Sequence, residues 1–168
     1  MFASVETSAR ANSGTLTIDT QNLRIQDGAD VSTSTLGNGN GGDLTVTATD
    51  IELKGTGSVL GASVEPGATG NGGTLIVDTR NLRVQDGAQV SAATFGNGDG
   101  GNLTVTATNV ELIGTSTGLA ASALSSSTGQ GGTLTVNAEN LTVRDGATID
   151  VRSEGIEAAG DLIINAPT

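Results

Sequence analysis

Few side chains in this sequence are of the types that carry out catalysis, and those present recur periodically. The 168 residues include no histidine, cysteine, tyrosine or tryptophan, and Lys54 is the only lysine. Histidine is the usual general base and the commonest transition-metal ligand. A polysaccharide-cleaving site would need clustered carboxylates, a basic residue and aromatic platforms for the sugar rings. We find no nucleophile–base pair, and we expect neither catalysis nor a cofactor.

One stretch, GNGDGG at 96–101, has the composition of a metal- or phosphate-binding loop. Calcium nonapeptide repeats need a nine-residue period with a regularly placed Asp. Neither is present, and Asn40 stands at the position that matches Asp99 one period earlier. A phosphate loop would continue with Lys and then Ser or Thr, and would open a helix. The sequence therefore favours a turn, with calcium binding as the alternative.

The overall charge limits the partners. Acidic residues outnumber basic ones 18 to 7, which gives a net charge of −11. Nucleic-acid binding needs a basic surface, so we expect no nucleic-acid partner and no binding to an anionic membrane. No apolar run reaches the length of a membrane helix, so we expect no membrane insertion. Residues 1–14 have no apolar signal-peptide core, and any export signal is expected outside this sequence.

The elements that would position these side chains come from an internal repeat. A glycine precedes each strand-like segment, at Gly14, Gly42, Gly73, Gly101, Gly132 and Gly160, and short and long intervals alternate between these positions. One short and one long interval together make the full period. Three Asp-Gly pairs recur once in each full period: Asp27-Gly28, Asp86-Gly87 and Asp145-Gly146. These pairs predict tight turns with glycine in a left-handed conformation. In the long repeats Gly55-Thr56 and Gly114-Thr115 replace them, which predicts a different bend.

Apolar residues alternate with polar ones inside each repeat. The second, fourth, ninth and eleventh positions after the reference glycine are apolar, as in Leu16, Ile18, Leu23 and Ile25. Period-two alternation predicts strands with one buried face. The eighth position predicts a corner between two strands. A third, weaker strand would contain the three extra residues of the long repeats. Together these elements predict an all-β, right-handed parallel β-helix. An antiparallel sandwich and a flexible glycine-rich chain are the alternatives.

We expect a single β-solenoid over residues 1–168, cut from a longer array. Residues 1–13 would form a partial coil, residues 14–159 five complete coils, and residues 160–168 the start of a sixth. Each coil would contain three strands, and short coils such as 14–41 would alternate with long coils such as 42–72. With a coil spacing of about 4.8 Å, five and a half coils would make a rod about 26 Å long.

Stacking would turn aligned positions into ladders. The eighth position predicts a column of side-chain amides at a corner, formed by Asn22, Asp50, Asn81, Asn109 and Asn140. The tenth position alternates in charge through Arg24, Glu52, Arg83 and Glu111. Adjacent opposite charges on a sheet favour pairing, so this column would help to fix the register. A polar binding strip is the alternative for the amide column.

A third column is rich in threonine: Thr17, Thr45, Thr104 and Thr135 share it with Ile76. Flat threonine arrays can bind ice, but the neighbouring column contains Asp19 and Asp78, which would disturb the match to ice. The simpler interpretation is that threonine is a good strand residue with a soluble side chain.

The phrases at 70–116 and 129–151 follow one pattern, GGxLTV, then NLxVxDGAxVS, then a glycine-rich loop. In this pattern the chain resembles the repeat region of filamentous-haemagglutinin-type exoproteins of two-partner secretion systems, especially cyanobacterial ones, over essentially its whole length. The resemblance implies a secreted, surface-exposed rod with structural and adhesive roles, an outer-membrane transporter as partner during secretion, and a cell-surface or glycan ligand. The family's secretion domain is not evident, so only the shaft resemblance applies.

The sequence therefore predicts a non-catalytic shaft or adhesin segment of a secreted exoprotein. The alternative is an extracellular filament whose subunits associate end to end. An ice-binding or polysaccharide-active β-helix is a more remote candidate.

Overall fold

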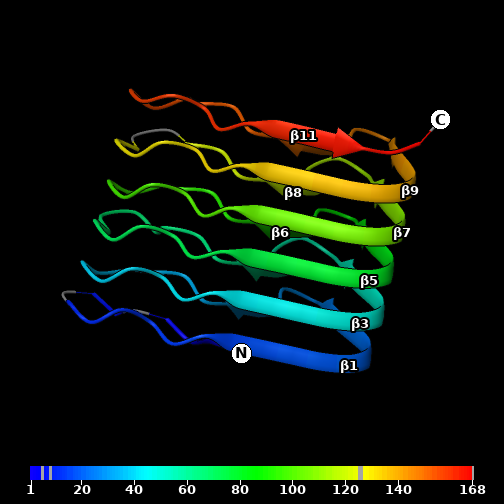
Figure 1. The fold of residues 1–168 in the computed structure, drawn as a ribbon, viewed down its shortest axis with the longest axis horizontal. Helices are drawn as coiled ribbons and strands as arrows, with labels where there is room; N and C mark the ends of the chain where they lie inside the picture. Colours follow the sequence, from blue (N-terminus) through cyan, green and yellow to red (C-terminus); the bar gives the residue numbers. More distant parts are fainter. Residues whose placement is uncertain (5, 8, 125–126, 168) are drawn as a thin grey trace.

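The computed structural model describes residues 1–4, 6–7, 9–124 and 127–167. Their regular secondary structure consists of β-strands, in which long strands alternate with short ones along the chain (Figure 1). The long strands are β1 (Leu16–Gln26), β3 (Leu44–Lys54), β5 (Leu75–Gln85), β7 (Leu103–Ile113) and β9 (Leu134–Arg144), followed by the shorter β11 (Leu162–Asn165). The short strands are β2 (Asp30–Ser32), β4 (Val59–Gly61), β6 (Gln89–Ser91), β8 (Gly118–Ala120) and β10 (Thr148–Asp150).

The strands form two parallel sheets. One has the order β1-β3-β5-β7-β9-β11 and the other β2-β4-β6-β8-β10. Equivalent residues pair without slippage, so that Leu16 lies beside Leu44, and Leu44 beside Leu75. In Figure 1 the chain crosses the front from left to right, turns at the right-hand edge and returns behind while it rises towards the C-terminus. The predicted right-handed parallel β-helix is confirmed.

The two strands expected before and after the corner form one bent strand. Pairing between β1 and β3 joins Thr20 to Ala48 and then Asn22 to Asp50, skipping one position. In β3 the exposed Thr49 and Asp50 therefore stand next to each other, while the alternation of buried residues resumes on both sides. Two consecutive outward residues turn the strand through the corner and keep both apolar sets inward, in the manner of a bulge.

The core is a stack of medium-sized aliphatic side chains. The column of Leu44, Leu75, Leu103 and Leu134 is 0% exposed. Alanine and valine fill the narrower positions, such as Ala62 and Val90. Because each side chain packs against its equivalents above and below, a small core is repeated coil by coil, and stability is roughly a sum of nearest-neighbour terms.

Opposite the bent edge, the chain passes from the short strand to the next long strand through a glycine-rich segment. We call the stacked segments at 33–43, 62–74, 92–102, 121–133 and 151–161 the glycine wing, in which residues 125–126 are not described. A Cβ added to Gly42, Gly73 or Gly101 would overlap the carbonyl oxygen of the equivalent glycine in the coil beneath. The repeated GG therefore allows neighbouring backbones to approach closely.

The location predicted for the three extra residues of the long coils was wrong. Paired residues are 28 apart at the end of β1 and β3, 29 apart in β2 and β4, and 31 apart where Asn71 N donates to Asn40 Oδ1. One extra residue therefore lies in the turn between the long and the short strand, and two lie at the wing tip. In short coils, Thr35 and Thr94 close the tip by donating to glycine carbonyls at 2.6 Å. The first long coil has Val64 at this position instead.

Candidate functional site

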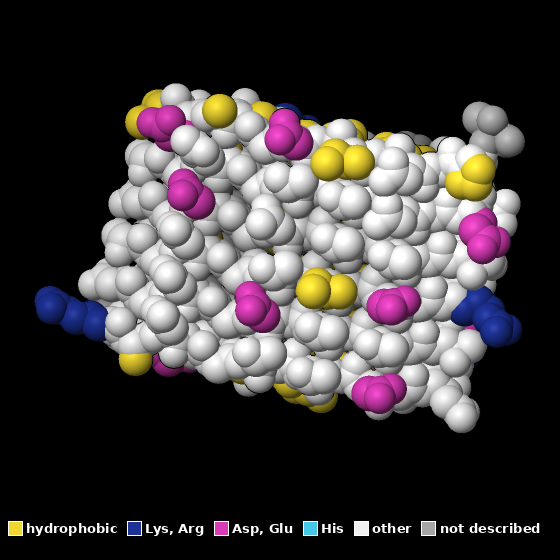
Figure 2. Space-filling model, in the orientation of Figure 1, with side chains coloured by type: hydrophobic (Ala, Val, Ile, Leu, Met, Phe, Trp, Pro, Cys, Tyr) yellow, Lys and Arg dark blue, Asp and Glu magenta, His cyan; other side chains and the backbone are white. Residues whose placement is uncertain are grey.

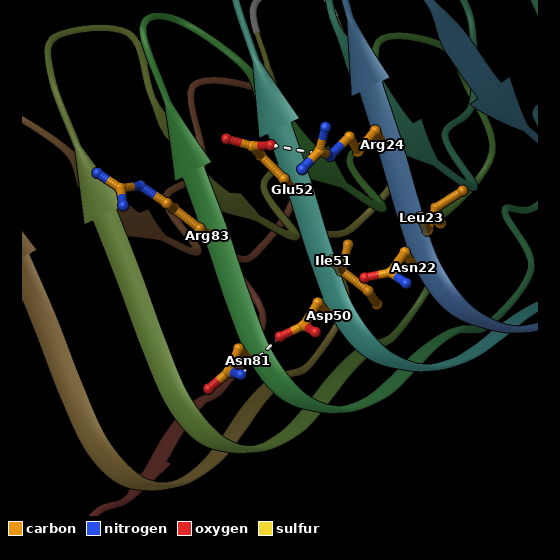
Figure 3. Close-up of a pocket in the computed structure, with 8 residues that line it drawn as sticks. All are labelled: Asn22, Leu23, Arg24, Asp50, Ile51, Glu52, Asn81 and Arg83. Atoms are coloured by element: carbon orange, nitrogen blue, oxygen red, sulfur yellow. Dashed lines mark hydrogen bonds and ion pairs between the residues drawn. The ribbon is translucent and has the colours of Figure 1, made fainter.

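The amide column lies along the bent edge of the long strands. Asn81 Nδ2 donates to Asp50 Oδ1 at 2.6 Å, and Asn109 Nδ2 donates to Asn81 Oδ1 at 2.7 Å. Asn140 Nδ2 continues the chain of bonds to Asn109 Oδ1 at 2.9 Å. Asn22 occupies the equivalent corner of the first long strand (Figure 3). These amides bind one another along the axis, so they support the corner.

The charged column consists of separate ion pairs. Arg24 Nε lies 3.4 Å from Glu52 Oε2, and Arg83 Nε lies 3.6 Å from Glu111 Oε2. Arg144, which was not predicted to belong to these pairs, reaches diagonally to Glu111 at 3.2 Å because its position is two residues further along the strand. These pairs are solvent-exposed, so each of them adds little to the stability of the fold.

A shallow hollow of about 260 Å³ lies between the amide and charged columns near the N-terminal end (Figure 3). It arises because Leu23 and Ile51, between the two columns, have side chains that turn towards the interior. Its polar groups already bind one another, as in the Arg24–Glu52 and Asn81–Asp50 contacts. The hollow therefore offers little free hydrogen-bonding capacity to a ligand.

The Asp-Gly corners are turns in which both residues have positive φ. Asp27 and Gly28 have φ of 57° and 78°, and Asp86 and Gly87 have φ of 57° and 86°, the signs of a type I′ turn. The third pair, Asp145 and Gly146, has the same signs, at 57° and 86°. Coil-to-coil bonds support these turns, for example from Gly87 N to Thr117 Oγ1 at 2.8 Å.

Asp99, the candidate calcium residue, belongs to a ladder that the sequence analysis did not recognise. Its Oδ1 accepts a hydrogen bond from Gln130 N at 2.9 Å, as Asn12, Asn40 and Asn71 accept from the next coil at 2.9, 2.9 and 3.0 Å. The sequence does contain a signal for this ladder, because a short side chain with an acceptor oxygen recurs at the equivalent position of these coils. Among the described residues, no group of three or more metal-ligating side chains comes together.

The threonine column is on the long-strand face that Figure 2 presents. Acidic and hydrophobic side chains are scattered over this face and separated by uncharged ones. Ile76 is 39% exposed there, and Asp78 is exposed two residues further along the strand.

The opposite face carries a longer depression, which we call the back groove. It consists of three overlapping cavities of about 410, 210 and 330 Å³ along the outer side of the short strands. Asp30 and Glu65 line both the first and the second cavity. Gln89, Ser91 and Phe95 line both the second and the third. The three cavities therefore form one continuous groove along the tube axis.

The back groove brings together the most unusual side chains of the protein. Phe2 and Phe95, the only two aromatic residues, both line it. Burial raises the pKa of the Asp30 carboxyl above its ordinary value. Burial also raises the pKa of the Glu65 carboxyl, and the nearby charge of Asp30 adds to the increase. Asp30 Oδ1 is buried without a hydrogen-bond partner among the described residues.

The floor of the groove consists of small residues. Ser32, Ser63, Ser91 and Ser122 are buried, and Gly118 completes the floor. The groove could not be recognised in the sequence, because the outward positions of a three-residue strand give almost no periodic signal. Only the stacking of the coils shows which outward side chains rise beside the groove and which form its floor.

Comparison with protein-family models, with curated proteins and with solved structures found no match. No helix in the described part of the chain has the length and hydropathy of a membrane span.

Proposed function

We propose that this chain is a non-catalytic shaft segment, with an adhesive role, of a secreted and surface-exposed exoprotein of the filamentous haemagglutinin type. The observation that carries the proposal is the unbroken coil-to-coil ladder. Every long strand pairs in register with the next, and amide and ion-pair columns join the coils outside the core. Such a stack extends by adding coils and presents a regular side surface, which suits display and contact with other cells.

The secretion partner follows from the sequence resemblance, with support from the fold. We propose that an outer-membrane transporter exports the chain unfolded. Each coil forms its hydrogen bonds with the preceding one, so folding can proceed in one direction as the chain emerges. The acidic surface disfavours association with nucleic acid and between rods.

A filament built end to end is the second candidate. The outer strand β11 leaves Leu162, Ile163 and Ile164 41%, 45% and 43% exposed, and its backbone edge could pair with β1 of a second copy. One feature opposes regular stacking of this kind. In one column of the glycine wing an added Cβ would overlap the coil beneath; this column contains Gly39, Gly70, Gly98 and Gly129. Ala11 occupies the equivalent position in the first coil, so its Cβ would hinder a second copy from stacking beneath it.

Light scattering coupled to size-exclusion chromatography, with small-angle X-ray scattering, tests the two candidates. The shaft proposal expects a monomer whose particle dimensions do not change with concentration. Concentration-dependent growth that Ile164→Lys abolishes would support the filament instead. Protease treatment of intact cells that produce the full-length protein tests surface exposure. Protection of the repeat region in intact cells, with digestion after lysis, would reject secretion.

A further inference from the structure

We propose that the back groove binds a linear, uncharged polysaccharide whose chain lies parallel to the tube axis. This inference rests on the proposed adhesive function and assigns the ligand class and the surface.

The shape requires an extended ligand. The groove passes from Phe2, which pairs with Ser32 of β2, to Asp150 in β10, the last short strand. Neighbouring coils are about 4.8 Å apart, and the outward side chains differ from coil to coil, as in the column of Asp30, Val59, Gln89, Gly118 and Thr148. A linear polymer can contact several coils at once along this length, whereas a compact ligand would occupy only one of the three cavities.

The available groups favour a glycan over a peptide. An extended peptide usually binds by adding a strand to the free edge of a sheet. The groove is on the face of a sheet, and its backbone groups are already paired, as in the bonds from Val59 N to Ala29 O and from Ala62 N to Ser91 O, both 2.9 Å. Several side chains along it are engaged as well: Ser63 Oγ lies 3.2 Å from Ser91 Oγ, and Gln89 Nε2 donates to Ser116 O at 3.3 Å. The groove still presents the Gln89 carbonyl oxygen, three carboxylates and two phenyl rings, from Glu6, Asp30, Glu65, Phe2 and Phe95. These suit a chain of hydroxyl groups with apolar ring faces.

The charge favours an uncharged glycan. Burial raises the pKa values of the Asp30 and Glu65 carboxyls, and the nearby charge of Asp30 raises the pKa of Glu65 further. Glu6 lines the same cavity, so an anionic sugar or a phosphate would add a negative charge beside three acidic side chains. At the other end, Arg152 is engaged by Asp150 at 3.1 Å and Glu154 at 2.9 Å, so its charge is already neutralised.

Phe95 marks the centre of the site. Its side chain is 37% exposed and lines both the middle and the C-terminal cavity. Leu36 and Leu124 flank the same groove at its two ends. Ligand pockets characteristically combine an aromatic surface with a few oriented polar groups. We infer that Phe95 stacks on a sugar ring while Gln89 and Glu65 bind its hydroxyls.

Isothermal titration calorimetry on the complete chain tests the proposal, with cellohexaose and hexa-N-acetylchitohexaose as neutral probes, polygalacturonate as the anionic probe and decalysine as the peptide probe. We expect at least one neutral hexamer to bind and polygalacturonate not to bind. Phe95→Leu, which keeps an apolar side chain as in Leu36, should weaken that binding about tenfold. Ile76→Ala is the matched control, because Ile76 is 39% exposed on the opposite face, and it should bind as the wild type does.

Three results would overturn the proposal: no binding of either neutral hexamer, equal affinity of Phe95→Leu and wild type, or binding of decalysine in preference to both sugars. Circular dichroism and X-ray scattering of each variant show whether the rod persists. A persistent rod without sugar binding would reject the groove ligand and leave the shaft proposal standing. Cleavage of a bound hexamer, detected by mass spectrometry, would support the groove as a glycan site and reject a non-catalytic role.

Discussion

Substitution of Gly101 by alanine tests the close packing of the glycine wing. The added Cβ would overlap the Gly73 carbonyl oxygen in the coil beneath, and both partners are backbone, so no flexible side chain can move aside. Relief of the overlap requires the coils to separate locally by about 1 Å. The adjacent bond from Leu75 N to Asn102 O, now 2.8 Å, would then lengthen to about 3.8 Å, beyond hydrogen-bonding range.

The expected loss of stability follows from these contacts. One or two hydrogen bonds at about 0.5–1.5 kcal/mol each, together with the strain of an overpacked site, give about 2–4 kcal/mol. Gly14→Ala is the matched control, because Gly14 begins the same column and an added Cβ there would meet nothing within 4 Å. Alanine at that position should change stability by less than about 1 kcal/mol, with a gain expected from the lower entropy of the unfolded chain.

Urea denaturation followed by circular dichroism measures both variants. Hydrogen exchange at the Leu75 amide adds a local measurement, and its protection should fall in Gly101→Ala but not in Gly14→Ala. The reasoning would be refuted if the stability of Gly101→Ala stayed within the small range of an ordinary surface substitution, about 0.5 kcal/mol from the wild type. Equal losses in the two alanine variants would refute it as well. The comparison separates the effect of the neighbouring coil from the general effect of replacing glycine.

Three further predictions concern the ladders and the groove. Arg83→Glu replaces the attraction to Glu111 by repulsion, so the melting temperature should fall more at low salt than at high salt, and a salt-independent fall would argue against the charge ladder. Asn109→Ala removes two side-chain hydrogen bonds and should lower the free energy of unfolding in urea by about 1–2 kcal/mol; an unchanged value would show that the amides do not stabilise the corner. Because the folded-state pKa values of Asp30 and Glu65 are raised, their contribution to stability is present at low pH and lost as pH rises through those values. Asp30→Asn should therefore weaken the fall in melting temperature as pH rises from about 4 towards neutrality, and an unchanged pH profile would contradict the burial of this carboxyl.

The sequence was informative about the fold because this architecture repeats. Leu44, Leu75 and Leu103 could be aligned by spacing alone, and the structure places them in one buried column. The amide column was readable for the same reason, since equal phase in the repeat implies stacking. The bent strand was harder to predict, because two consecutive polar residues are compatible with either a loop or a corner inside a continuous strand.

The back groove could not be predicted from the spacing. Asp30 and Glu65 belong to different coils, and the sequence does not show that they face the same depression. The role of Asp99 was also hidden, because a ladder from a side chain to the backbone of the next coil depends on the distance between two loops. Its residue type alone left calcium binding open.

The sequence by itself determined the repeat period, the inward aliphatic columns and the turns, because alternation and turn chemistry are local properties that repetition makes legible. Only the tertiary structure decided how closely the wing backbones stack, where the three extra residues lie, and which outward side chains surround a groove. These features depend on distances between atoms of different coils. A sequence period fixes the order of residues along the tube, but it does not fix the height or depth of its surface.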